Sequence, residues 1–202
     1  ATGLTLALTG IALSQSNTVP LPKVVPPVTG QKPVVQKKKQ FEFATDLEGL
    51  FKQLSRTRDA KLADRISTKI WEIWQTSDSR SVDLLTNWAR SASGSRRFGV
   101  ALDLLDQVVA LRPQYAEGFN QRATLHFMME NYGKSIVDIE RTLALEPRHY
   151  GALGGLAAIL ERLGEKQQAL DTWYRVLTVY PAMKSAQDSV VRLEEDLAGD
   201  GI

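Results

Sequence analysis

The stretch from Val82 to Met183 repeats one pattern three times, closing with LRPQY at 111–115, LEPRH at 145–149 and VYPAM at 179–183. The three prolines, Pro113, Pro147 and Pro181, are each separated by 34 residues. Aligning the chain on them brings small residues into two columns, Ala89, Ala123 and Ala157 in one and Ala101, Ser135 and Ala169 in the other. A fixed period of this length is typical of stacked helical hairpins. The small residues let two helices approach closely, and proline ends each unit because it cannot continue a helix.

This pattern resembles the tetratricopeptide repeat family, with consecutive matches at 82–115, 116–149 and 150–183. The resemblance implies an all-α fold, a right-handed α-solenoid of helix-turn-helix units. In the first repeat we expect helices near 82–93 and 97–111. After Pro181 we expect a capping helix at 184–198, because apolar residues recur on one face and charged residues on the other.

One residue departs from the columns. Arg122 occupies the position that is Trp88 in the first repeat and Leu156 in the third. An arginine there must reach solvent or an acid, which predicts a looser contact at this point of the stack.

Residues 45–80 predict a helical hairpin ahead of the repeats. Thr45 and Glu48 have the spacing of a capping box, and Asp59 is placed to cap a second helix. The closing proline is missing and the small-residue columns fit poorly. We therefore interpret the hairpin as a divergent first repeat or an N-terminal cap.

Residues 1–14 (ATGLTLALTGIALS) form a short apolar run that ends in small residues. About a dozen apolar residues suit the core of a signal peptide better than a membrane span, which needs roughly 20. The run lacks an initiator methionine and a basic leading segment, so an uncleaved anchor and a buried strand remain alternatives. We expect a bacterial protein of the periplasm or cell envelope, with a cytoplasmic location as the alternative.

Residues 15–44 predict a disordered, extended linker. This segment holds five prolines and five lysines and shows no helical or strand periodicity in its Pro/Lys-rich part. A spacer is the simplest interpretation. Recognition by a proline-binding module, or attraction to anionic lipid or cell-wall polymer, is the alternative.

The charge is divided unevenly along the chain. Residues 1–40 carry five lysines and no acid, while the remaining residues hold 20 bases against 23 acids. The slightly acidic repeats are therefore not expected to bind nucleic acid. The chain contains no cysteine, which excludes disulfides, thiolate metal sites and cysteine nucleophiles.

We find no catalytic constellation in the sequence. His126 and His149 belong to different repeats, and no neighbouring residues complete a metal-binding or acid–base motif with either, so we expect structural roles for both. There is no phosphate loop, nucleophile elbow or dinucleotide-binding turn. The chain is therefore predicted to have no enzymatic activity, no cofactor and no metal.

The family resemblance implies a concave groove, lined by the first helix of each repeat, that takes an extended peptide or a helix. Carried over by position, its residues are Asp83, Thr86, Arg90, Glu117, Asn120, Thr124, Phe127, Met128, Gly151, Gly154, Ala158 and Glu161. Asn120 would hold a ligand backbone through its amide, and Phe127 and Met128 would supply apolar area. Arg90 would meet a carboxylate. For each residue, plain solvent exposure or helix packing is the alternative.

One subtype of the family clamps C-terminal carboxylates with lysines, an asparagine and an arginine. Only Asn120 matches that clamp, because Thr86 and Gly151 stand where lysines are needed. We therefore reject this form of recognition.

Gly154 and Gly155 lie inside a predicted helix, where each glycine costs about 1 kcal/mol relative to alanine. Two explanations stay open. The glycines allow close packing between repeats, or they leave room for the backbone of a ligand.

The sequence thus predicts a non-enzymatic adaptor that binds a protein segment in the concave groove. A membrane contact would arise only through an uncleaved 1–14 segment. A membrane-tethered or cell-wall-associated scaffold that positions an enzyme partner is the alternative, and a protein that self-assembles through its end helices is a further one. The pattern specifies neither the partner nor the oligomeric state.

Overall fold

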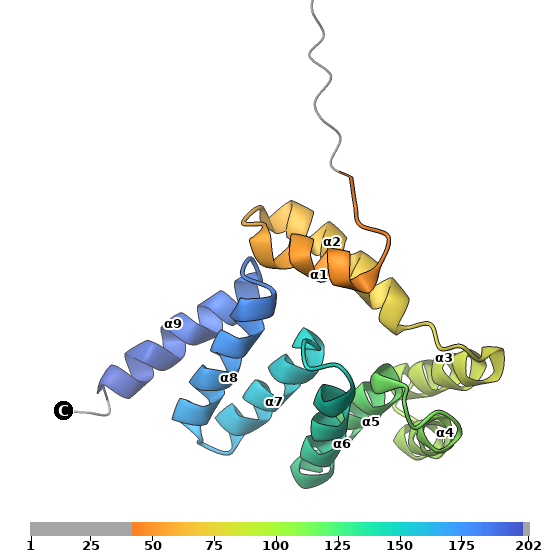
Figure 1. The fold of residues 1–202 in the computed structure, drawn as a ribbon. Helices are drawn as coiled ribbons and strands as arrows, with labels where there is room; N and C mark the ends of the chain where they lie inside the picture. Colours follow the sequence, from red (N-terminus) through yellow and green to blue (C-terminus); the bar gives the residue numbers. More distant parts are fainter. Residues whose placement is uncertain (1–41, 200–202) are drawn as a thin grey trace, which may run out of the picture. The chain divides into compact units, whose positions relative to one another are not determined.

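The computed structural model describes residues 42–199, and the apolar run 1–14 and most of the predicted linker lie outside these residues. The described part is all-helical (Figure 1). Its helices are α1 (Leu47–Arg56), α2 (Ala60–Trp74), α3 (Arg80–Gly94), α4 (Phe98–Leu111), α5 (Ala116–Met128), α6 (Tyr132–Leu145), α7 (Tyr150–Arg162), α8 (Lys166–Val179) and α9 (Lys184–Gly199). None of them is both long and apolar enough to cross a membrane.

The three repeats are the helix pairs α3–α4, α5–α6 and α7–α8, and α9 packs on α8. The six residues of the small columns, Ala89, Ala101, Ala123, Ser135, Ala157 and Ala169, are all at most 2% exposed. At this close contact in the second repeat, the Ser135 hydroxyl donates to the Ala123 carbonyl at 2.8 Å. Each pair of helices is therefore held at the short distance that small side chains permit.

The turn inside each repeat places one residue in the left-handed region of φ. These residues are Arg96 (φ 56°), Glu130 (φ 60°) and Gly164 (φ 82°), which share one position of the 34-residue period. In each turn the next residue donates its N–H back into the first helix, as Glu165 does to the Leu160 carbonyl at 2.9 Å. This is the usual left-handed ending of a helix, where glycine is the favoured residue.

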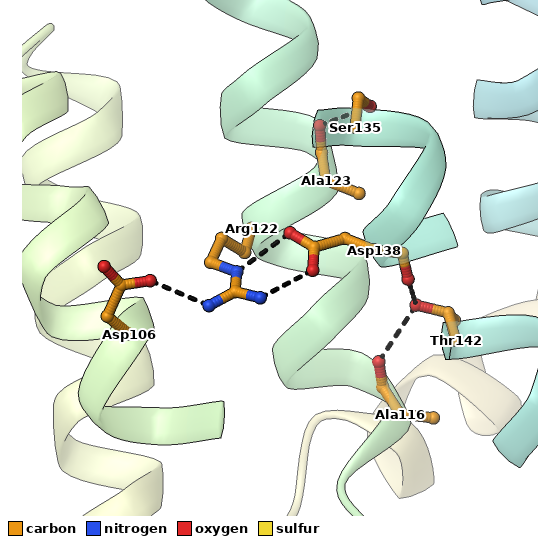
Figure 2. A network of polar contacts seen from close by, with 7 residues as sticks. All are labelled: Asp106, Ala116, Arg122, Ala123, Ser135, Asp138 and Thr142. Atoms are coloured by element: carbon orange, nitrogen blue, oxygen red, sulfur yellow. Dashed lines mark hydrogen bonds and ion pairs between the residues drawn. The ribbon is translucent and has the colours of Figure 1, made fainter. Parts of the chain in front are cut away.

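Arg122 joins the first and second repeats through two carboxylates (Figure 2). Its Nε and Nη2 donate to Asp138 on α6 at 2.8 and 2.6 Å, and its Nη1 donates to Asp106 on α4 at 2.8 Å. The hydrogen bond to Asp138 raises the pKa of the Arg122 guanidinium further above its already high value. The predicted looser contact is therefore replaced by a three-residue ionic bridge, because acids are present on both neighbouring helices.

The first helix begins differently from the prediction. Asp46, and not Thr45, is its N-cap, and the Asp46 carboxylate accepts from the Gly49 N–H at 2.6 Å. Glu48 points away and forms an ion pair with Arg148 at 2.6 Å. Asp59 caps α2 as predicted, accepting from the Leu62 N–H at 3.0 Å.

The hairpin α1–α2 packs against the third repeat. Its buried side chains belong to one apolar cluster with those of α7, α8 and α9, whereas α3 and α4 form a separate cluster with Leu125 of α5. Figure 1 shows α2 leading from this contact to the linker that enters α3. The hairpin thus does not form a further unit stacked on α3, because its large aromatic side chains find their partners at the start of α7.

Aromatic rings form the centre of that contact. Trp74 stacks on His149 with ring centroids 4.0 Å apart, and Trp71 meets Tyr150 edge-on at 5.9 Å. Tyr150 and Ser67 share a hydrogen bond between hydroxyls at 2.8 Å. We call this group of residues, Trp71, Trp74, His149 and Tyr150, the aromatic joint.

Candidate functional site

A small apolar pocket opens between the first helices of the second and third repeats. Its volume is about 120 Å³. The pocket exists because the residues of α7 that face α5 are small. Its lining is Asn120, Ala123, Thr124, Phe127, Ser135, Ile139, Gly151, Ala152, Gly155 and Ala158.

A second, larger hollow of about 390 Å³ lies between α3 and α5. It shares Asn120 and Thr124 with the first pocket, so the two hollows are neighbours, and we call them together the concave groove. Its remaining lining is Trp71, Ala89, Arg90, Ser93, Gly94, Leu105, Glu117, Gln121 and Leu125. The aromatic joint therefore contributes one wall of the groove through Trp71.

The floor of the groove is a buried polar cluster. The Glu117 carboxylate accepts from Asn120 Nδ2 and Gln121 Nε2, each at 2.9 Å. His149 Nδ1 accepts from the Ala152 N–H at 3.1 Å, and its Nε2 lies 3.3 Å from Glu117 Oε2. Glu117 and His149 are 4% and 0% exposed, so this cluster is enclosed by the fold and fixes the side chains around it.

Two arginines stand at the edges of the groove. The Arg162 guanidinium lies over the Phe127 ring at 5.3 Å, and Arg90 Nη1 donates to Asn87 Oδ1 at 3.3 Å. Within residues 42–199 no carboxylate forms an ion pair with either arginine. The groove therefore combines apolar walls with two positive charges at its rim.

Tyr115, which precedes α5, is half-buried near the groove, and its hydroxyl is enclosed. Burial raises the pKa of its hydroxyl, and the nearby Glu117 and Asp83 carboxylates act in the same direction. The phenol thus stays neutral at physiological pH.

Several predicted groove residues do line the groove. Phe127 and Ala158 form the wall of the small pocket, and Gly151 lies at its margin. Thr124 is exposed where the two hollows meet, and Arg90 borders the larger one.

Other predicted groove residues are engaged inside the domain. Thr86 needs correction: it is 1% exposed and donates to the Val82 carbonyl, because its face of α3 packs inward. Glu117 and Asn120 line the larger hollow but bind each other, so the Asn120 amide nitrogen is committed. Asp83 accepts from the Ser77 N–H at 2.7 Å and holds the linker before α3.

The last three predicted residues lie at the margins. Met128 is 48% exposed and lines neither hollow, although its sulfur lies 3.8 Å from the Ser93 hydroxyl. Glu161 accepts from Trp173 Nε1 at 2.7 Å and from Arg192 Nη2 at 2.6 Å, so it joins α7, α8 and α9. Gly154 faces the Trp173 ring.

The structure adds Trp71 and Gly155 to the lining of the groove, and it places Arg162 over the Phe127 ring at its edge. Gly155 was marked in the sequence by its cost to a helix, and it does leave space beside Ile139. Trp71 had no such signal, because its place depends on how the hairpin docks. Among the described residues, no three or more His, Cys, Asp or Glu side chains come together in a group that could bind a metal ion.

A TPR repeat-containing protein of Rhizobium etli is 49% identical over 154 residues, which is 76% of this chain and 76% of that protein. No protein-family model matches the chain. On the strength of the Rhizobium relative, the chain belongs to the TPR repeat-containing proteins.

Solved structures of TPR domains share the fold at low sequence identity. The first TPR of Spaghetti (RPAP3), bound to an HSP90 peptide, is 19% identical with a TM-score of 0.57, covering 60% of this chain and 96% of that one. MamA is 20% identical with a TM-score of 0.55, over 69% and 80% of the two chains. The Sgt2 TPR domain from Aspergillus fumigatus is 14% identical with a TM-score of 0.57, over 61% and 83%.

Proposed function

We propose that this protein is a non-enzymatic adaptor that binds a segment of a partner protein in the concave groove. The observation that carries the proposal is the apolar pocket of about 120 Å³, which lies beside a larger hollow lined by the same helix, α5. Pockets that combine apolar walls with a few placed polar groups are typical of ligand sites.

The size of the pocket defines what it accepts. A cavity of about 150 Å³ lined by apolar side chains holds a molecule of benzene. A pocket of about 120 Å³ therefore suits one branched aliphatic side chain, such as leucine, of an extended peptide. Thr124 and the Asn120 carbonyl oxygen lie beside it and would meet the peptide backbone.

The charge at the rim of the groove indicates which residues flank the apolar side chain that the small pocket accepts. We call that apolar residue of the peptide the anchor. Arg162 stands over Phe127 in the pocket wall, and Arg90 borders the larger hollow. An aspartate or glutamate next to the anchor residue would form a charge-assisted hydrogen bond with either guanidinium. The partner segment is therefore acidic with one large apolar residue.

The comparisons support the class of activity. The structure of the first TPR of Spaghetti contains an HSP90 peptide, and that of the yeast Sti1 TPR2B domain contains an Hsp70 partner. Both share the fold of this chain. They support recognition of a protein segment, while the carboxylate clamp is still not proposed here because its lysine positions are Thr86 and Gly151.

A periplasmic or envelope location remains part of the proposal. It rests on the signal-like composition of residues 1–14, which suits export. N-terminal sequencing of the protein isolated from cells tests it, and a mature start at Gln15 is the expected result.

Binding is tested with two short labelled peptides, one with a central leucine flanked by aspartates and one with alanine in place of the leucine. We expect the leucine peptide to bind the full chain more tightly by about tenfold or more, since burying a leucine side chain gives about 1.5–3 kcal/mol. Fluorescence anisotropy measures both affinities.

The test variant is Ala158→Leu, which fills the pocket from its own wall. The control is Ala144→Leu, the same change at an exposed site of α6. Loss of binding in the first variant and retention in the second is expected. Equal affinity for both peptides, or equal binding by both variants, would refute the groove as the binding site.

A further inference from the structure

The hairpin α3–α4 presents an apolar surface that we call the head face. It consists of Leu84 and Trp88 on α3 and of Val100 and Leu104 on α4. Leu84, Trp88 and Val100 are 47%, 54% and 48% exposed, and Leu104 is half-buried. Single exposed apolar residues are ordinary on a protein surface, but a contiguous group of them marks an interaction site.

The second repeat shows what this surface does inside the stack. At the same positions, 34 residues later, it carries Gly118, Arg122, Lys134 and Asp138. There the surface faces α4: Arg122 binds Asp106 at 2.8 Å, and a Cβ on Gly118 would lie 2.8 Å from Val108. In an inner repeat, this surface is therefore the contact with the second helix of the preceding repeat.

The third repeat follows the same rule. Its equivalent residues are Ala152, Leu156, Gln168 and Thr172. Ala152 and Leu156 belong to one apolar cluster with Ile139 of α6, the preceding second helix. In the first repeat the preceding hairpin, α1–α2, joins the third repeat through the aromatic joint, and the head face stays exposed.

The head face is also built differently from its inner counterparts. Leu84 occupies the position where the inner repeats have Gly118 and Ala152. All four residues of the head face are large and apolar. A helix that approached as closely as α4 approaches α5 would collide with Leu84. The head face therefore does not fit an ordinary preceding repeat and needs a partner surface at a wider spacing.

Charge and composition narrow the choice of partner. The four residues carry no charge, so an acidic or basic partner gains nothing there. The other large apolar residues exposed in the described part are separated along the chain, each on or directly after a different helix: Ile73, Leu111, Met128, Val137, Leu163, Tyr174 and Val191. On α9, at the opposite end of the stack, Val191 is surrounded by Asp188, Glu194 and Glu195. The described surface that complements a head face is thus a second head face.

We propose that two copies of this chain associate through their head faces in a two-fold symmetric dimer. Such an interface uses the same patch on both subunits and closes on itself, so it does not extend into filaments. Leu84 and Trp88 of one copy would interdigitate with the same residues of the other. The small pocket lies between α5 and α7 and stays accessible, so the dimer would present two grooves to a partner.

The test is the mass of the full chain in solution by sedimentation equilibrium over a range of concentrations. We expect a mass of twice 22.4 kDa. The double variant Trp88→Arg, Val100→Lys introduces the residues that the second repeat has at these positions. It should weaken the dimer about a hundredfold or more, since centrally placed tryptophans dominate interface energies. Both sites are about half exposed, so the fold is kept, which circular dichroism verifies.

The control is Val137→Lys with Val191→Lys, which changes two apolar residues that are 63% and 54% exposed elsewhere. This variant should remain a dimer. The single variant Leu84→Gln should weaken the dimer in the same direction as the double head-face variant. A wild-type chain that is monomeric up to about millimolar concentration, or a dimer that the head-face variants leave intact, would overturn the proposal.

Discussion

At the scale of single residues, Gly151 shows why a helix contains glycine although glycine lowers helix stability relative to alanine. A Cβ at this position would lie 2.9 Å from two ring atoms of Trp71. At Gly154 and Gly155 the nearest atoms to such a Cβ are 3.5 and 3.6 Å away, which is ordinary contact. Close packing thus explains Gly151, and at Gly155 the missing side chain leaves room in the groove.

We expect Gly151→Ala to destabilise the protein by about 1–2 kcal/mol, because the strain against Trp71 outweighs the gain in helix propensity. The matched change Gly154→Ala should be neutral or stabilising by up to about 1 kcal/mol. Urea denaturation of both variants measures the two free energies of unfolding. The explanation fails if both variants gain stability equally.

His126 couples stability to pH. It is 6% exposed, and burial lowers the pKa of its imidazole below 6.5. Among the charges around it, Lys134 and Arg122 act in the same direction, while Asp138 and Asp106 oppose them. Because the unfolded chain takes up the proton more readily, the contribution of His126 to stability is present above pH 6.5 and is lost as the pH falls through the lowered pKa.

The free energy of unfolding should therefore decline between pH 7 and pH 5 with a component that His126→Phe removes. Denaturation midpoints of the wild type and the variant across this range provide the measurement. An identical slope for both proteins would show that His126 does not contribute.

At the scale of elements, the turns inside the three repeats can be compared directly, because they place different residues at the same position. Arg96, Glu130 and Gly164 adopt the same left-handed conformation, but glycine is present only in the third turn. A residue with a side chain pays about 1 kcal/mol there, an amount that glycine avoids.

We expect Glu130→Gly and Arg96→Gly each to stabilise the protein by about 0.5–1 kcal/mol, and Gly164→Ala to destabilise it by about 1 kcal/mol. Thermal unfolding of the three variants compares these effects. As a control, Gly133→Ala lies in the first turn of α6, where a Cβ would meet open space, and should not destabilise. If Glu130→Gly and Arg96→Gly both lowered the stability, the left-handed conformation would not be the source of the cost.

At the scale of the whole described unit, the aromatic joint links parts of the chain that are far apart in sequence. Ser67 bonds Tyr150 across 83 residues, and the Tyr180 hydroxyl donates to Asp64 at 2.6 Å across 116 residues. Burial raises the pKa of both tyrosines, so these hydroxyls stay protonated. In a simple repeat array each unit contacts only its neighbours. Here the first hairpin and the third repeat depend on each other.

Trp74→Ala should cost about 3–5 kcal/mol, because Trp74 is 7% exposed and fills the centre of the joint. Hydrogen exchange should accelerate in α1, α2 and the first turn of α7 together. The neighbouring Ile73→Ala, at a site that is 39% exposed, should cost less than about 1 kcal/mol. Faster exchange confined to α1 and α2 would contradict the coupling.

The 34-residue period predicted the helices of the repeats. It could do so because helix propensity and the contacts between adjacent helices depend on residues that recur at the same positions of each repeat. The N-cap of α2 at Asp59 followed from the same local rules. The docking of α1–α2 did not, because the contact of Trp74 with His149 has no local signature. The family resemblance, carried over by position, indicated which face of α5 lines the groove. It could not show that Asn120 and Glu117 bind each other, since that depends on side-chain conformation in a buried cluster.

The aromatic joint has a mechanical consequence. A solenoid of helical hairpins stretches and relaxes like a spring, because each unit is free to rotate slightly on the next. In this chain Trp74, the last residue of α2, stacks on His149 at the start of α7, and only residues 75–79 separate it from α3. The short connection ties the start of the first repeat to the third. Opening the spring would require the tryptophan rings to leave their contacts. The width of the groove is therefore set before any partner arrives, and a ligand that enters it need not supply the energy to shape it.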